Sequence, residues 1–143
     1  MSEYKMRISA KGFFFDDRGR VLLIKGLHRD KNDGQEYWAT PGGGVEEGEN
    51  LKQAAEREFL EETGYNGQAD KIVFVQDYTN YWQKRSFEVF FSGKVLKKDA
   101  NVKPDHESKF FSEEEFKKII FLPEDINPFK LKKGVWYSEK LNR

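Results

Sequence analysis

Residues 43–65 read GGVEEGENLKQAAEREFLEETGY and combine a glycine pair, an acidic turn and a strongly predicted helix. Leu51 to Thr63 is the best helix candidate in the chain. Asn50 before it and Gln53 in its first turn fit a capping box, and Gly64 after it is a typical C-terminal stop. The segment therefore predicts an α-helix over residues 51–63 that a glycine-rich turn precedes.

Two glutamates of this helix lie on its apolar side. On a wheel of about 100° per residue, Glu58 and Glu62 fall on the centre line of the face that Leu51, Ala54 and Ala55 make apolar. A solvated surface helix would place them on the opposite side. Burying two unpaired carboxylates costs several kcal/mol each, and their mutual repulsion adds to that cost. We therefore expect a positive charge to compensate them.

A divalent cation is the compensating charge that the helix predicts. Arg57 is adjacent to Glu58 in sequence but points to a different sector of the wheel. A hard, oxygen-seeking cation can bridge carboxylates at positions i and i+4, and Mg²⁺ keeps coordination positions open for phosphate oxygens. The alternative is a solvated acidic helix end, because charge runs usually face water. The glycine run 42–44, which brings the backbone close to the helix start, favours the cation.

These residues resemble a known family pattern. Gly43, Glu49 and the run Arg57 to Gly64 match the Nudix box, which fixes Gly, Glu, Arg-Glu, an apolar residue, Glu-Glu and Gly at set spacings. Tyr65 stands where that box usually has an aliphatic residue. The chain thus resembles the Nudix hydrolase superfamily of MutT-like pyrophosphohydrolases. The resemblance implies one domain over residues 1–143, with an α/β fold built as an α/β/α sandwich around a mixed β-sheet.

The resemblance also implies the chemistry, which is hydrolysis of a nucleoside diphosphate linked to another group. It assigns Glu58, Glu61 and Glu62 as metal ligands, Gly42 as a backbone carbonyl ligand, Arg57 and Glu49 as an ion pair that holds the helix, and Glu107 as a further carboxylate on a later loop. Glu61 or Glu107 is the candidate base that takes the proton of the attacking water. The implied cofactor is Mg²⁺, with Mn²⁺ as a substitute. An ordinary loop acid is the alternative for Glu107.

The rest of the chain predicts strands and two further helices. The expected strands and helices are strands 6–15 and 20–27 joined as a hairpin by a turn at 16–19, strands 37–39, 71–77 and 85–95, a helix from a capping box of Ser112 and Glu115 to about Ile120, and a last helix opened by Asn127 and Pro128. Strands followed by a helix, more strands and terminal helices indicate a mixed sheet with helices packed on it.

Composition excludes several function classes. The chain has 143 residues, with 25 Lys and Arg against 25 Asp and Glu, so its formal net charge is zero. That balance argues against nucleic-acid binding through bulk positive charge. No cysteine is present, which excludes a disulfide scaffold and a cysteine nucleophile and fits a reducing, cytoplasmic location. No apolar run approaches the about 20 residues of a membrane span.

Substrate contacts are less clearly predicted. Arg29, in the polar loop facing the box, is a candidate phosphate contact, and Tyr81 and Trp82 are candidates for stacking on a base. Tyr81 also weakly resembles a diadenosine-polyphosphate marker. A solvated loop and plain sheet packing are the respective alternatives. His106, beside Glu107, could act as an acid or base, but we expect it to be a surface-loop histidine.

The expected function is Mg²⁺-dependent cleavage of a pyrophosphate bond in a nucleoside triphosphate, deoxynucleoside triphosphate or dinucleoside polyphosphate. The proline signatures of ADP-ribose and NADH hydrolases are missing after the box. One alternative is a non-catalytic nucleotide sensor, although the box acids are retained. Another is an RNA 5′-end pyrophosphohydrolase, which could use a local basic patch at Lys130, Lys132 and Lys133. The expected partner is a small nucleotide-type substrate, not nucleic acid or a membrane, and a homodimer stays open.

Overall fold

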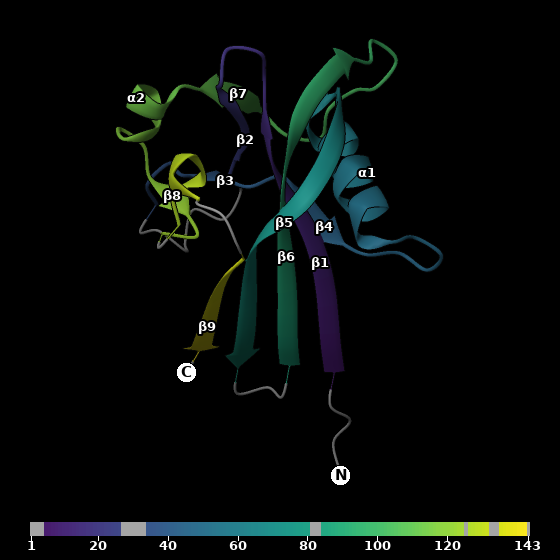
Figure 1. Cartoon of the computed structure of the whole chain (residues 1–143), viewed down its shortest axis with the longest axis vertical. Helices are drawn as coiled ribbons and strands as arrows, with labels where there is room; N and C mark the ends of the chain where they lie inside the picture. The colour runs from purple at the N-terminus through teal and green to yellow at the C-terminus, as the bar shows by residue number, and fades with distance from the viewer. Residues whose placement is uncertain (1–4, 27–33, 81–83, 125, 132–134, 143) are drawn as a thin grey trace.

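The computed structural model describes residues 5–26, 34–80, 84–124, 126–131 and 135–142 (Figure 1). The elements run in the order β1 (Lys5–Phe15), β2 (Val21–Lys25), β3 (Trp38–Ala39), β4 (Gly42–Gly44), α1 (Leu51–Thr63), β5 (Tyr65–Asn80), β6 (Lys84–Lys98), β7 (Ser108–Phe111), α2 (Glu113–Phe116), β8 (Phe121–Leu122), the 3-10 helix η2 (Pro128–Lys130) and β9 (Trp136–Asn142).

The strands form one mixed sheet in the order β8-β3-β2-β1-β6-β5-β9, with β4 paired to β1 and β7 paired to β2. The pairs β1 with β6, β5 with β9 and β3 with β8 are parallel, and the other pairs are antiparallel. In Figure 1 the lower halves of β1, β6, β5 and β9 extend together below the level of α1. The predicted α/β class with a mixed sheet is confirmed.

The predicted hairpin between β1 and β2 is present. Phe15 pairs with Val21, and the Oδ1 atom of Asp16 accepts backbone N–H bonds from Arg18 at 3.0 Å and Arg20 at 2.8 Å. Asp16 thus closes the turn through its side chain, as turn-forming Asp residues do. Beyond this tip, β2 leaves β1 and pairs with β3 and β7.

Alternating phenylalanines divide the core between the two faces of the sheet. Phe14 stacks on Phe59 of α1 with ring centroids 4.1 Å apart. Phe13, which points to the opposite face, stacks on Phe90 at 5.5 Å in the cluster that also contains Phe116 of α2. Burial of each such ring stabilises the fold by about 1.5–3 kcal/mol. Helix α1 therefore covers one face, and α2 with η2 and their loops cover the other.

Helix α1 spans the residues that its sequence predicts. Asn50 and Gln53 form both bonds of the capping box, at 2.8 and 2.9 Å. Gly64 takes a left-handed conformation with φ 79° and donates its N–H to the carbonyl of Leu60, which ends the helix. The buried side of the helix carries Ala54, Ala55, Phe59, Glu62 and Thr63.

Three predictions about the other elements were wrong. The 42–44 run is not a turn but strand β4, which pairs antiparallel with β1. The second capping box of Ser112 and Glu115 forms, yet its helix ends at Phe116 and not near Ile120. The carbonyl of Ile120 instead accepts the N–H of Trp38, so the chain has already become extended to pair with β3. Asn127 caps a single 3-10 turn, not an α-helix.

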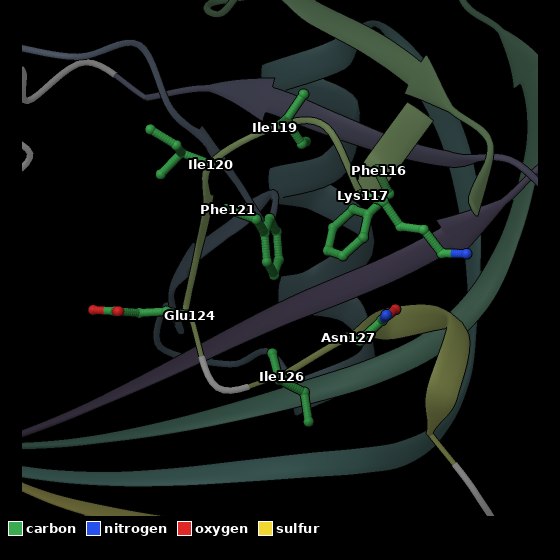
Figure 2. Close-up of a pocket in the computed structure, with 8 residues that line it drawn as sticks. All are labelled: Phe116, Lys117, Ile119, Ile120, Phe121, Glu124, Ile126 and Asn127. Atoms are coloured by element: carbon green, nitrogen blue, oxygen red, sulfur yellow. The ribbon is translucent and has the colours of Figure 1, made fainter. Parts of the chain in front are cut away.

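The α2 face also carries a hollow that is separate from the acidic helix (Figure 2). Phe116 and Phe121, which both line it, pack edge to face with ring centroids 5.1 Å apart. Its lining is Phe116, Lys117, Ile119, Ile120, Phe121, Glu124, Ile126 and Asn127. No residue of the Nudix-like segment contributes to this lining.

Candidate active site

The glycines of β4 bring two carboxylates of α1 together. Gly42 has φ 151°, and a Cβ atom there would lie 2.5 Å from the carbonyl oxygen of Ala10, so the position requires glycine. Its N–H donates to Oε1 of Glu62 at 2.7 Å. A Cβ atom on Gly43 would lie 2.8 Å from the carboxyl carbon of Glu58. Both carboxylates therefore lie directly against the β4 backbone.

Glu62 is a buried carboxylate with little positive charge around it. The residue is 8% exposed, and burial raises its pKa to about 7. The nearby charge of Glu58 raises the pKa further, while the Gly42 N–H and Lys11 lower it. Oε2 of Glu62 lies 3.3 Å from Nε2 of His106. The wheel thus placed Glu62 correctly on the buried side of the helix.

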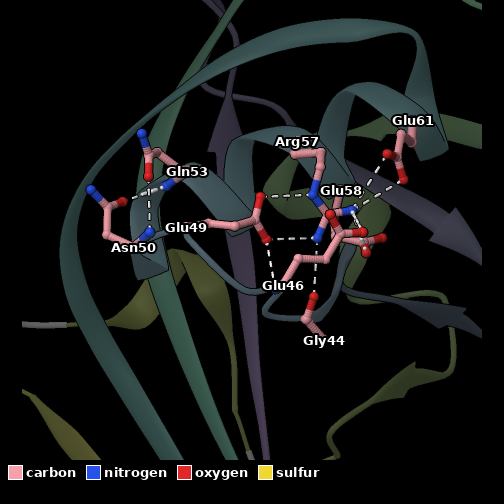
Figure 3. Close-up of polar contacts among 8 residues, drawn as sticks. All are labelled: Gly44, Glu46, Glu49, Asn50, Gln53, Arg57, Glu58 and Glu61. Atoms are coloured by element: carbon pink, nitrogen blue, oxygen red, sulfur yellow. Dashed lines mark hydrogen bonds and ion pairs between the residues drawn. The ribbon is translucent and has the colours of Figure 1, made fainter.

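Arg57 is the centre of the polar network in Figure 3. Its guanidinium binds Glu49 in a bidentate way, with Nε–Oε2 2.8 Å and Nη2–Oε1 2.9 Å, and donates to the carbonyl of Gly44 at 3.0 Å. Its Nη1 reaches Glu58 Oε1 at 3.0 Å. The expectation that Arg57 does not compensate Glu58 was therefore wrong, because the long arginine side chain reaches its neighbour from a different sector of the helix.

The pair of Arg57 and Glu49 ties the start of α1 to the loop before it. The hydrogen bonds from Arg57 lower the pKa of Glu49 to about 2, and Glu49 raises the pKa of Arg57 further above its ordinary value. Glu49 Oε1 also accepts the backbone N–H of Glu46 at 2.8 Å. The ion pair that the resemblance implies is thus present between these two side chains.

Glu61 and Glu107, the two candidate bases, are the more exposed carboxylates. The side chain of Glu61 is 48% exposed and lies 3.3 Å from Nη1 of Arg57. The side chain of Glu107 is 66% exposed, lies 3.7 Å from Nζ of Lys25, and its backbone carbonyl accepts the Lys25 N–H at 2.8 Å. Glu61 therefore borders the carboxylate pair on the helix, whereas Glu107 lies on the loop that leads into β7.

That loop is bonded to the last turn of α1. The N–H of Asp105 donates to the carbonyl of Glu61 at 3.0 Å, and the N–H of His106 donates to the carbonyl of Glu62 at 3.3 Å. The expectation that His106 is a surface-loop residue was wrong, since its side chain is only 18% exposed. Sequence reasoning could not place it, because a polar loop carries no periodic pattern from which its packing could be read.

The helix carboxylates fit a hard divalent cation. In the part of the chain that the structure describes, no three Asp, Glu or His side chains form a ready-made metal cluster. Among the described residues, Glu62 is nevertheless a buried carboxylate that forms no ion pair with Lys or Arg, and Glu58 occupies the space into which a Cβ on Gly43 would project. Carboxylate oxygens are the donors that Mg²⁺ and Mn²⁺ prefer. Glu58 and Glu62, with Glu61 beside them, are the residues that would hold such an ion.

The predicted residues Arg29, Tyr81, Trp82, Lys132 and Lys133 lie outside the described residues. Gly42 lies beside Glu62, to which it donates its N–H, and the role of its carbonyl as a metal ligand stays a prediction.

A family model described as the NUDIX domain matches residues 5–139. The chain belongs to the Nudix family. Within the described residues, no helix is both long enough and apolar enough to cross a membrane.

The names of similar proteins agree with this family assignment. An RNA pyrophosphohydrolase of Rhodopseudomonas palustris is 32% identical over 115 residues, which cover 68% of this Nudix chain and 68% of the relative. One of Brucella anthropi is 30% identical over 132 residues, covering 80% and 74%. The chain spans only 37% of the length of Nudix hydrolase 5 of Arabidopsis thaliana, to which it is 26% identical.

Solved structures show the same fold. A Nudix hydrolase from Nitrosomonas europaea superposes with a TM-score of 0.66 at 25% identity, covering 80% of this chain and 78% of that one. A second Nudix hydrolase structure from the same organism gives a TM-score of 0.70 at 19% identity, covering 99% and 82%.

Proposed function

We propose that this Nudix hydrolase is a Mg²⁺-dependent pyrophosphohydrolase. Its substrate would be a nucleoside triphosphate, a deoxynucleoside triphosphate or a dinucleoside polyphosphate. The observation that carries the proposal is the pair of α1 carboxylates, Glu58 and Glu62, lying against the glycine backbone of β4. A buried carboxylate without a counter-charge is costly, so this arrangement is best explained by a cation that arrives with the substrate.

The cation would supply charge neutralisation for the pyrophosphate and a more acidic water. Glu58 and Glu62 would hold it, and Mn²⁺ has the same preference for oxygen ligands. Burial of Glu62 keeps this carboxylate out of bulk water, which strengthens its attraction to a divalent ion.

Glu61 is the better placed of the two candidate bases. Its carboxylate belongs to the same helix turn as Glu58 and Glu62, is half exposed, and is held by Arg57 only at 3.3 to 3.4 Å. A loosely held, solvent-accessible carboxylate can turn to accept a proton from the attacking water. Glu107 is the alternative, and its contact with Lys25 at 3.7 Å is equally loose.

Arg57 and Glu49 would act by orienting the helix. Their bidentate pair, together with the bond from Arg57 to the Gly44 carbonyl, fixes the loop of β4 against the first turns of α1. The same guanidinium holds Glu58 until a cation competes for it. Substitution of either partner would therefore disturb the positions of the carboxylates rather than remove a reacting group.

The test is a hydrolysis assay with Mg²⁺ against deoxynucleoside triphosphates, diadenosine polyphosphates, ADP-ribose, NADH, nucleotide sugars and 5′-triphosphate RNA. Products identified by mass show which bond breaks. Turnover of one compound by the wild type, and not by Glu62→Gln, is the expected result. Mg²⁺-dependent binding of a compound without turnover would contradict the proposal and favour a nucleotide sensor.

Cleavage at the 5′ end of RNA is a second candidate because the Rhodopseudomonas and Brucella relatives are named RNA pyrophosphohydrolases. The zero net charge of the chain does not favour it. Binding of RNA would weaken steeply as salt rises, whereas binding of a small nucleotide would change much less. A competition assay between 5′-triphosphate RNA and GTP at two salt concentrations distinguishes an RNA substrate from a small nucleotide.

A cytoplasmic location and a homodimer stay predictions.

A further inference from the structure

His106 makes a side-chain contact with the buried carboxylate of the site. Its Nε2 lies 3.3 Å from Oε2 of Glu62, while the N–H of Gly42 donates to the other oxygen, Oε1, at 2.7 Å. The two oxygens of Glu62 thus each face one nitrogen from a different part of the chain. Of these two nitrogens, only the one on His106 belongs to a side chain.

The backbone that carries this ring is bonded to the end of α1. The N–H of His106 donates to the carbonyl of Glu62, and the N–H of Asp105 donates to that of Glu61. A further bond joins the N–H of Asp99 to the carbonyl of Gly64 at 2.8 Å. The loop is therefore attached at several points to the end of α1, and these bonds hold the backbone of His106 beside Glu62.

The other ring nitrogen shows that His106 is more than a space-filling residue. Nδ1 is buried and has no hydrogen-bond partner among the described residues. A buried polar atom without a partner costs stability, so an apolar side chain would fill this space more favourably. Among the described residues, the contact of Nε2 with Glu62 is the side-chain interaction that sets a histidine apart from such a residue.

We propose that His106 is a positioning residue that holds Glu62 in the orientation needed to bind the divalent cation. This inference rests on the proposed function, since it takes Glu62 as a ligand. Side chains that contact a metal ligand without touching the metal orient that ligand, and their loss typically weakens metal affinity by about 10–100-fold. His106 would act through Glu62 and would not touch the substrate.

The test compares two amides at this position by titration with Mn²⁺, using the free-ion signal in electron paramagnetic resonance. In His106→Gln the amide nitrogen can reach the place of Nε2, whereas in His106→Asn it stays near the place of Nδ1. His106→Leu is the apolar variant of similar volume. Thermal midpoints in EDTA report on any purely structural effect, and Glu62→Gln serves as the variant without the ligand.

The inference predicts that the Mn²⁺ dissociation constant rises roughly tenfold or more in His106→Asn and His106→Leu. His106→Gln should remain within about threefold of the wild type, because it restores the nitrogen that faces Glu62. Equal affinity in the wild type, the Asn variant and the Leu variant would overturn the role of His106 alone. Failure of the wild type to bind Mn²⁺, or equal binding by Glu62→Gln, would overturn the metal site and this inference with it.

Discussion

Glu49 and Glu62 both belong to the Nudix box of residues 43–65 and have opposite surroundings. Glu49 receives two N–H bonds from Arg57 and one from the backbone of Glu46, and these hold its pKa at about 2. Glu62 is buried, receives one N–H bond from Gly42, and burial raises its pKa to about 7. One carboxylate thus has its negative charge fully matched within the chain, and the other does not.

This difference distinguishes a carboxylate with a structural role from a carboxylate whose charge a bound cation would compensate. A carboxylate paired with arginine stabilises the folded protein on its own, as Glu49 does between the loop and α1. A carboxylate buried without such a partner destabilises the protein until a cation binds. The following predictions test whether Glu62 and its neighbour Glu58 are of the second kind.

The largest expected effect is loss of turnover in Glu58→Gln and Glu62→Gln. Each substitution removes a negative charge that would hold the cation, so we expect turnover to fall by orders of magnitude with the fold intact. Product formation measured by mass spectrometry checks this. Glu47→Gln, which changes an exposed glutamate of the preceding loop, is the matched control and should keep its activity. Near-normal turnover in both site variants would contradict the account.

A smaller loss of turnover is expected from Gly43→Ala. A Cβ atom there would lie 2.8 Å from the carboxyl carbon of Glu58 and must push that carboxylate away from β4. A displacement of about 1 Å in a catalytic group can cost up to about 100-fold in rate. Gly44→Ala is the control, because its nearest atoms, on Arg7, are 3.8 Å away. Equal kinetics for the two alanine variants would show that Glu58 does not depend on this contact.

Without metal, the stability of the wild type should depend on pH through Glu62. Its folded pKa of about 7 lies above the ordinary value of 4.5. The cost of ionising it is therefore absent below about pH 4.5, grows as pH rises, and is complete above about pH 7. In urea unfolding with EDTA, the free energy of unfolding of Glu62→Gln should rise relative to that of the wild type between about pH 4.5 and about pH 7, by about 3 kcal/mol at most. A constant difference between the two proteins would contradict the raised pKa.

The smallest expected effect concerns Glu49, the carboxylate that is paired with Arg57. Arg57→Lys replaces the planar guanidinium and its several N–H donors with a single ammonium group. Glu49 and the Gly44 carbonyl therefore cannot both keep their hydrogen bonds. We expect a loss of about 1–2 kcal/mol in the free energy of unfolding. Urea unfolding measures it, with the exposed Arg18→Lys as control. A loss no larger than in the control would show that the Glu49 pair contributes little.

Local signals predicted the helix of the site well. Asn50, Gln53 and Gly64 act within one turn of the positions they cap, so the limits of α1 could be read directly from the chain. The helical period alone placed Glu62 on the buried face. The reach of Arg57 to Glu58 could not be predicted in this way, because a wheel records the direction of the Cβ atom and not the path of a long side chain.

Elements that depend on distant partners were harder to predict. Strand β9 has a polar, charged sequence and forms by parallel pairing with β5, some 60 residues earlier in the chain, as in the pair of Phe74 with Trp136. Strand β4 consists of glycines alone, which have low strand propensity, and is held by its register with β1. The partly buried position of His106 likewise depends on bonds between its loop and α1.

The most direct test of the central claim is the thermal midpoint of the wild type and Glu62→Gln at pH 8, with EDTA and with increasing Mg²⁺. A ligand that binds only the folded state stabilises it by an amount that rises with the logarithm of the ligand concentration once this exceeds the dissociation constant. We expect the midpoint of the wild type to keep rising with Mg²⁺ concentration and that of Glu62→Gln to change little or not at all. An equal rise in both proteins, or no rise in either, would show that Glu62 does not await a divalent cation.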